Sequence, residues 1–211
     1  MVSDRAVNVA PGRLEGWIAR FAERHGTLAF QPSPAALLLT APDGATARLV
    51  NRWLDPVPNA DDPVAAFIAH ATRPRRVGLL LARKSAHAIG VAVGDTLELH
   101  RVDTHYIQGR TKAGGWSQQR YARRRGNQAS RAFSDAADDV AELLVPRLGE
   151  LEGIVCGGDR TAITAVLEGF DAVNALRTHH PVLPTPDPRL VVLTEFASEV
   201  RKVAISLNEL A

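Results

Sequence analysis

Three consecutive strand-like segments limit the folds open to this chain more than any other feature. They occupy residues 75–107 (RRVGLLLARKSAHAIGVAVGDTLELHRVDTHYI), which are rich in Val, Leu and Ile, and turns near Lys84-Ser85 and at Gly94-Asp95 separate them. Connections this short join antiparallel neighbours, so the pattern predicts three antiparallel strands in a row.

A long amphipathic helix is expected after these strands. Apolar or small residues recur at spacings of seven, four, three, four and three, at Ala122, Ala129, Phe133, Ala136, Val140 and Leu143. This stripe predicts one helix from about Ser117 to about Leu148. The alternative is a break near Gly126-Asn127, with Ser134 capping a second helix.

The remainder of the chain adds a parallel crossover. EGIVCGGDRTAITAVLEGF (152–170) predicts a strand, a glycine turn and a helix capped by Asp159. LVVLT (190–194) predicts a last strand, and the residues from 195 to 210 a last helix. The expected fold class is therefore α/β (an α+β mixed sheet), with helices flanking the sheet and a glycine loop leading into the long helix.

The first 62 residues form a separate pattern. Residues 13–25 have helical spacing, two strands meet at a Pro42-Asp43-Gly44 turn, and the proline-rich stretch 51–63 predicts a loop. We expect an N-terminal α+β extension over 1–62, packed on a main domain over 63–211 that begins with a short helix.

Composition points to the cytoplasm. Cys156 is the single cysteine, so no disulfide framework is possible, and no apolar run is long enough to span a membrane. The N-terminus lacks a basic start followed by an apolar stretch, so no secretory signal is expected.

The charge is concentrated in one segment. Seven basic residues and no acidic residue lie between Arg110 and Arg131, whereas the rest of the chain has 18 basic and 23 acidic residues, a net charge of −5. Such asymmetry is typical of contact with nucleic acid or another polyanion.

Other candidate sites are weaker. Gly157-Gly158-Asp159 could hold a phosphate, but a turn and helix cap explain the same residues, and the spacing fits neither a dinucleotide fingerprint nor a Walker loop. The seven histidines show no metal-binding spacing, with His179-His180 as the only cluster. Cys156 is expected in the core. We therefore expect neither a metal nor a cofactor.

The segment KAGGWSQQRYARRRGNQ (112–128) can support hydrolysis next to RNA. Gly114 and Gly115 permit close approach of the backbone, and Trp116 suits stacking on a base. Gln118 and Gln119 cannot act as general bases, but a glutamine can orient water and hydrogen-bond a developing oxyanion without being repelled by phosphates.

This segment, followed by a long helix, resembles the middle domain of archaeal and eukaryotic class I peptide release factors. In that family a Gly-Gly-Gln tip precedes an Arg-Phe-Ala-Arg helix start, and the matching residues are Gly114, Gly115 and Arg120-Tyr121-Ala122-Arg123. The similarity extends over roughly residues 63–211 and is greatest to the actinobacterial Vms-like release factors.

The resemblance implies a peptidyl-tRNA hydrolase that acts in ribosome rescue. The implied partners are peptidyl-tRNA and ribosomal RNA at the peptidyl-transferase centre of the large subunit, with no membrane and no DNA. The implied proton acceptor is the tRNA ribose. The implied RNA contacts are Arg110, Lys112, Trp116, Arg120, Arg123, Arg124 and Arg125.

One departure affects the catalytic assignment. When the Arg-Tyr-Ala-Arg register is kept, Trp116 occupies the position of the family's glutamine, and Gln118 and Gln119 follow later. The Vms-like branch places its glutamine after an extra residue, which favours Gln118, with Gln119 as the alternative. Two other functions also stay open: cleavage of the tRNA 3′ end, and a non-catalytic ribosome-binding module.

Overall fold

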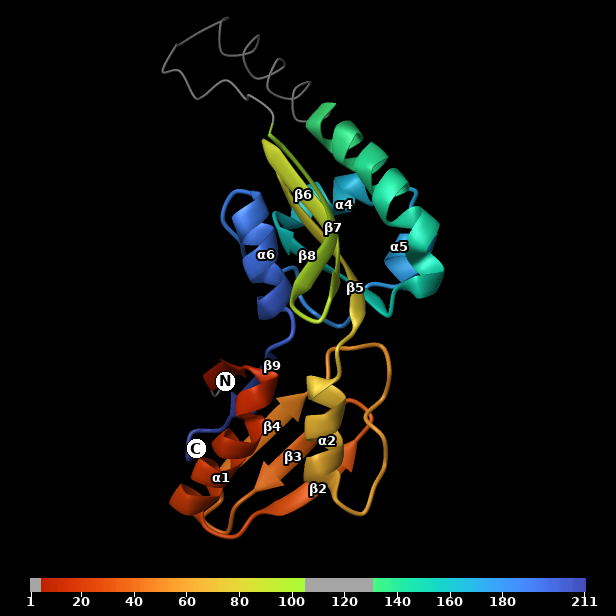
Figure 1. Cartoon of the computed structure of the whole chain (residues 1–211). Helices are drawn as coiled ribbons and strands as arrows, with labels where there is room; N and C mark the ends of the chain where they lie inside the picture. The colour runs from red at the N-terminus through yellow and green to blue at the C-terminus, as the bar shows by residue number, and fades with distance from the viewer. Residues whose placement is uncertain (1–4, 105–130) are drawn as a thin grey trace, which may run out of the picture. The chain divides into compact units, whose positions relative to one another are not determined.

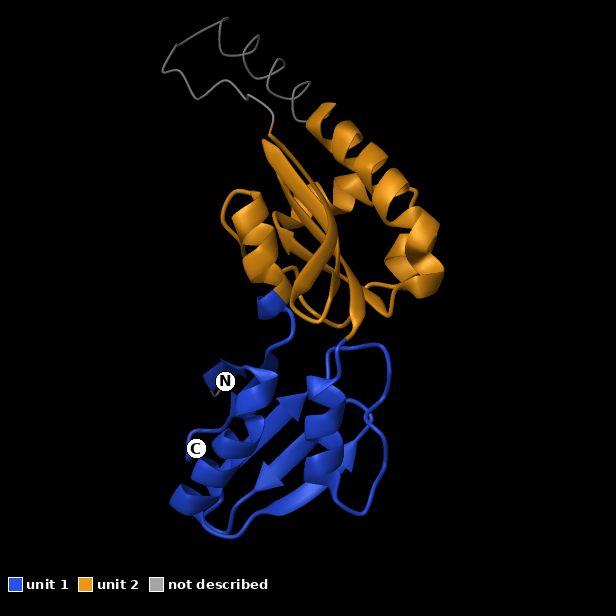
Figure 2. Ribbon diagram, in the orientation of Figure 1, with its two compact units in different colours: residues 1–74, 198–211 blue, residues 75–197 orange. Residues whose placement is uncertain are grey.

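The computed structural model describes residues 5–104 and 131–211. Two compact units make up the chain: residues 1–74 together with 198–211, and residues 75–197 (Figure 2). Within the described ranges, no helix is both long enough and apolar enough to cross a lipid bilayer.

The first unit contains a five-stranded sheet in which every neighbouring pair is antiparallel. In spatial order its strands are β1 (Arg5–Val9), β9 (Val203–Leu207), β4 (Thr46–Val50), β3 (Ala36–Thr40) and β2 (Ala29–Ser33). The strand nearest the C-terminus thus lies between two strands from the start of the chain, which makes the sheet dependent on both ends of the sequence.

Two helices cover one face of this sheet (Figure 1). They are α1 (Leu14–His25), preceded by the 3-10 turn η1 (Pro11–Arg13), and α2 (Pro63–Thr72). Leu14 and Phe67 pack with Leu39, Leu49 and Ile205 in one apolar core. Gly26, with φ of 93°, ends α1, and the side chain of Asp62 caps α2 by accepting from the N–H groups of Val64 and Ala65.

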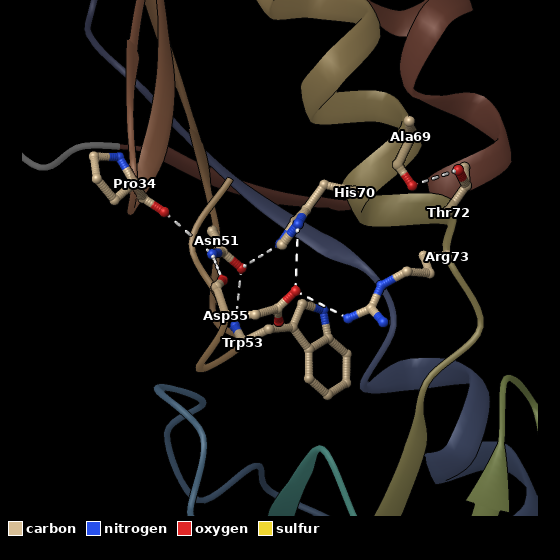
Figure 3. A network of polar contacts seen from close by, with 8 residues as sticks. All are labelled: Pro34, Asn51, Trp53, Asp55, Ala69, His70, Thr72 and Arg73. Carbon is tan, nitrogen blue, oxygen red and sulfur yellow. Dashed lines mark hydrogen bonds and ion pairs between the residues drawn. The ribbon is translucent and has the colours of Figure 1, made fainter. Parts of the chain in front are cut away.

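A buried polar network fixes the loop between β4 and α2 (Figure 3). Asn51 donates to the carbonyl of Asp55 at 2.7 Å and accepts from the N–H of Trp53 at 3.0 Å. His70, on α2, lies 3.3 Å from the Asn51 side-chain oxygen and 3.5 Å from the Asp55 carboxylate, which also pairs with Arg73 at 2.9 Å. These contacts hold the proline-rich loop against α2 without regular structure.

The second unit contains a four-stranded mixed sheet in the order β7-β6-β5-β8. Strands β5 (Arg76–Arg83), β6 (Ala86–Val93) and β7 (Thr96–Thr104) are antiparallel, and β8 (Gly153–Gly158) runs parallel to β5. Helix α6 (Leu190–Glu199) packs on one face, where Leu193 and Phe196 lie against Gly90 and Gly157.

The other face of this sheet carries the remaining helices: α4 (Arg160–Val166), α5 (Asp171–Ala175) and a helical stretch over residues 131–143, which leads into the 3-10 helix η2 (Val145–Glu150). Ala136, Val140 and Leu144 pack against Leu80 and Ile89 of the sheet. The unit is therefore a three-layer α/β arrangement, as the expected fold class requires.

Several expectations are confirmed. The helix over 13–25, the strands on either side of Pro42-Asp43-Gly44, the three antiparallel strands and the strand–turn–helix after residue 152 are all present. Of the helix predicted from about Ser117 to about Leu148, residues 131–143 are helical, with Ser134 inside the helix, but the helix ends before Leu148, where the 3-10 helix η2 follows.

The prediction for the C-terminal segment was wrong. Residues 190–199 form a helix and 203–207 a strand, the reverse of the expected order. Val192, Leu193, Phe196 and Ala197 are buried at helical spacing, and this packing outweighs the β-propensity of the valines.

The unit boundary also differs from the expected division at 62/63, because α2 packs in the core of the first unit and β9 pairs with β1 and β4.

Candidate catalytic segment and its flanking elements

All the predicted site residues lie outside the described residues, in the range 105–130. They are the catalytic candidates Gly114, Gly115, Gln118 and Gln119 and the RNA-binding candidates Arg110, Lys112, Trp116, Arg120, Arg123, Arg124 and Arg125. The structure describes the elements on both sides of them.

These elements belong to the second unit. Strand β7 is an edge strand of the mixed sheet and extends to Thr104, and the chain is helical from residue 131. Ala132 and Ala136 bury the start of that helix, while Arg131 is exposed. The range 105–130 thus lies between a strand held by its pairing with β6 and a helix held by buried packing, both in the same unit.

An ionic network with a buried centre joins helix 131–143 to strands β6 and β7 of the sheet. Asp139, on helix 131–143, accepts at 2.8 Å from Nε2 of His87 on β6 and at 2.5 Å from the guanidinium of Arg101 on β7. The same guanidinium nitrogen lies 2.6 Å from the carboxylate of Glu142, one helical turn further along. His87 is only 2% exposed and Asp139 only 9% exposed.

The strand register explains why these side chains meet. His87 and Ile89 are two residues apart on β6, and Arg101 is opposite Ile89 on β7. All three therefore lie on the sheet face that carries helix 131–143. The carboxylates of Asp139 and Glu142 raise the pKa of the Arg101 guanidinium above its ordinary value. A permanently charged arginine therefore links β7 to the helix on the far side of the range 105–130.

No local pattern in the sequence singles out this network. Asp139 follows Arg101 by 38 positions and His87 by 52 positions. An isolated histidine in an apolar strand gives no local sign of such a distant partner. Two signals together could have suggested the network. One is the register of β6 and β7, and the other is the acidic residue Asp139 beside the apolar stripe of the helix.

At Gly157-Gly158-Asp159, the structure shows a turn and a helix cap. The Asp159 carboxylate accepts from the N–H of Thr161 at 2.9 Å, and Gly158 has φ of 101°. These contacts account for the three residues without a phosphate. This confirms the interpretation of the motif as a strand-to-helix turn.

Cys156 is a core residue, as expected. Its side chain is buried in β8, and burial raises the pKa of its thiol to about 11. A thiol with that pKa is protonated at neutral pH and does not supply a nucleophilic thiolate. His180, in the proline-rich loop, hydrogen-bonds Thr178 at 2.8 Å. In the described part of the chain, no three His, Cys, Asp or Glu residues are grouped as a metal site would need.

The second unit is therefore an α/β unit in which a basic, glycine-containing segment connects an edge strand to a helix packed on the sheet. Residues 75–206, more than half of the chain, match the family model of the actinobacteria/chloroflexi VLRF1 release factor. The chain belongs to this family of release factors.

Curated relatives carry a related name. Peptide chain release factor subunit 1 of Thermococcus onnurineus (strain NA1) is 35% identical over 83 residues, which are 38% of this chain and 20% of that protein. The protein of the same name from Thermococcus sibiricus is 31% identical over 94 residues, 44% of this chain and 23% of that protein. The chain therefore matches only about a fifth to a quarter of these relatives' length.

Among solved structures, the archaeal translation termination factor aRF1 aligns with a TM-score of 0.45 and 14% sequence identity, over 90% of this chain and 62% of that one.

Proposed function

We propose that this protein hydrolyses the ester between a nascent peptide and tRNA on stalled large ribosomal subunits. The observation that carries the proposal is the match of residues 75–206 to a release factor family. Within that range lies the acid-free segment with two glycines and two candidate glutamines. The curated relatives named peptide chain release factors support the same reaction class.

The chemistry follows from the residue types in the segment. Gly114 and Gly115 lack a Cβ and allow the backbone to approach the ester closely. Gln118, or Gln119, positions the attacking water and, with backbone N–H groups, stabilises the oxyanion of the tetrahedral intermediate. An amide is uncharged, so phosphates around the ester do not repel it, as they would repel a glutamate.

The basic residues of the segment bind RNA in this proposal. Arg110, Lys112 and the arginines at 120, 123, 124 and 125 neutralise phosphates of ribosomal RNA and the tRNA acceptor end, and Trp116 stacks beside them. The contacts of Asp139 with His87 and Arg101 join helix 131–143 to β6 and β7, so the elements on either side of the segment are connected to each other. A reaction of this type requires positioning, because a small displacement of the reacting groups lowers the rate strongly.

A release assay tests the proposal. Stalled large-subunit complexes carrying labelled peptidyl-tRNA are mixed with the wild-type chain and with Gln118→Ala, Gln119→Ala and Gly115→Ala variants. We expect free peptide and intact tRNA from the wild type. One of the two glutamine variants should be slower by about 100-fold or more, as for loss of an oxyanion-stabilising group. Gln128→Ala, in the same segment but without a proposed role, is the matched control.

The alternative functions give different products. A shortened tRNA would indicate cleavage of the tRNA 3′ end in place of ester hydrolysis. Bound complexes with the peptide still attached would indicate a docking module, and both glutamine variants would then behave as the wild type does.

A further inference from the structure

Three arginines and a tryptophan form a row along helix α1 in the first unit, beginning at Arg13, the residue just before the helix. Arg13, Trp17, Arg20 and Arg24 follow one another at spacings of four, three and four residues, which places them on one side of the helix. We call these four residues the arginine stripe. With a rise of 1.5 Å per residue, the stripe is about 16 Å long. It lies before residue 75 and therefore outside the part of the chain that matches the release factor family.

A shallow hollow of about 150 Å³ lies beside the stripe and adds another arginine. Its lining includes Arg5, Trp17, Arg20, Arg24 and Leu207. Arg5 is paired with Leu207 across the β1–β9 register, and Leu207 belongs to the core under the helices. Arg5 therefore lies on the helix-covered face of the sheet, at its edge, next to α1.

The positive charge of this region is not neutralised by ion pairs. Arg5, Arg20 and Arg24 are exposed residues. Among the salt bridges of the described residues, none involves these arginines or Arg13, although the same helix contains Glu15 and Glu23. Glu15 lies on the opposite side of α1 from the stripe. A negatively charged ligand could thus pair with these arginines without breaking existing ion pairs.

Trp17 provides a flat apolar surface among these charges. Its ring stacks on Phe21, with ring centroids 5.4 Å apart and planes inclined by 13°, and it remains partly exposed at the hollow. Phe21 is buried in the core, so the indole is held in place before any ligand arrives. A fixed aromatic ring between arginines is the combination that binds single-stranded nucleic acid, where bases stack and phosphates meet cations.

We infer that the arginine stripe and its hollow form a second RNA-binding surface, which takes single-stranded RNA independently of the segment 105–130. Arg5, Arg20 and Arg24 contact phosphates, and Trp17 stacks on one base. Trp17 also packs against the core, but its exposed part offers a flat surface on which a base can stack and which an acidic protein surface would not need, and this favours RNA. The inference concerns binding and does not depend on the proposed hydrolysis.

The test measures RNA affinity in a background in which three of the seven cations of the segment are neutralised. The full chain carrying Arg123→Gln, Arg124→Gln and Arg125→Gln is titrated against a labelled, unstructured RNA of about 12 nucleotides, followed by fluorescence anisotropy. Adding Arg20→Glu or Arg24→Glu should weaken binding about five- to tenfold and reduce the log–log salt slope by about 0.7 per lost phosphate contact.

Arg48→Glu is the matched control. Arg48 is an exposed arginine of the same unit, and its strand partners are Leu38 and Ser206, so it lies on the sheet face away from α1. We expect a clearly smaller effect from this variant. An equal loss of affinity in Arg48→Glu would mean that only net charge matters and would overturn the inference. Circular dichroism melting curves test whether each variant is folded.

Tryptophan fluorescence supplies a site-specific signal. In a Trp116→Phe background, RNA should quench the emission, and Trp17→Phe should abolish the quenching because Trp53 is buried. Unchanged RNA affinity in the Arg20→Glu and Arg24→Glu variants, with loss of ribosome co-sedimentation, would instead indicate an acidic protein partner and reject the RNA surface.

Discussion

At Gly158 the backbone has a conformation that residues other than glycine rarely adopt, and other atoms fill the space where a side chain would be. Its φ is 101°, and a Cβ at this position would lie 2.3 Å from the carbonyl oxygen of Ala82. The same oxygen accepts a hydrogen bond from the N–H of Asp159 at 2.8 Å. The turn that starts helix α4 is therefore pressed directly against the end of β5.

Comparing substitutions at two glycines separates the cost of backbone strain from the cost of steric overlap. Gly158→Ala should lower the free energy of unfolding by about 2–4 kcal/mol, through backbone strain and steric overlap together. Gly169→Ala is the control, because Gly169 also has a positive φ, of 80°, but open space around it. The Gly169→Ala variant should lose about 1–2 kcal/mol of unfolding free energy, from backbone strain alone. Urea unfolding of both variants measures the difference, and equal losses would show that the overlap relaxes.

Residues with local partners could be predicted from the sequence, and residues with distant partners could not. The Asp159 cap is recognisable because its acceptor meets an N–H two residues later. The burial of Cys156 follows from its apolar strand. The contact of His87 with Asp139 depends on where a helix crosses a sheet, which no short-range pattern specifies.

At the scale of elements, Asp139 connects β6, β7 and helix 131–143. Asp139→Asn should destabilise the protein by about 2–3 kcal/mol, because two donors would lose a charged acceptor in a largely buried place. Glu142→Gln changes the more exposed partner of the same Arg101 and should cost about 0–1 kcal/mol.

Thermal unfolding of these two variants gives the comparison. In addition, hydrogen exchange at helix 131–143 should become faster in Asp139→Asn if the network holds this helix to the sheet. Similar melting temperatures for both variants would show that the buried carboxylate contributes no more than the exposed one.

Elements with strong periodicity were predictable, and elements that depend on the rest of the fold were not. The three antiparallel strands and α1 have clear spacing. The edge strand β2 (Ala29–Ser33) is short, exposed and contains a proline, and β1 is a strand because β9, about 200 residues later, pairs with it. Helix α6 was mistaken for a strand because Val191 and Val192 have high β-propensity, whereas its burial has helical spacing.

For the whole molecule, the distribution of charge matters more than its sum. The chain has a net charge of +2, but residues 110–131 carry seven positive charges and the remainder has a net charge of −5. Phosphate-rich RNA is therefore attracted to this segment and repelled by much of the remaining surface, apart from local cationic regions such as the arginine stripe. In the proposed function, this asymmetry would orient the chain as it approaches RNA.

Contacts between the basic segment and RNA phosphates should weaken with salt by a predictable amount. If the six cations at 110, 112, 120, 123, 124 and 125 each neutralise one phosphate, RNA affinity should fall with a log–log salt slope of roughly −4 to −5. The arginine stripe is inactivated by Arg20→Glu and Arg24→Glu, so that the slope reports the segment alone. Neutralising Arg123, Arg124 and Arg125 with glutamine should then reduce the slope by about half. A slope near zero would show that the segment does not bind phosphates, and the charge asymmetry would then have no role in bringing the protein to RNA.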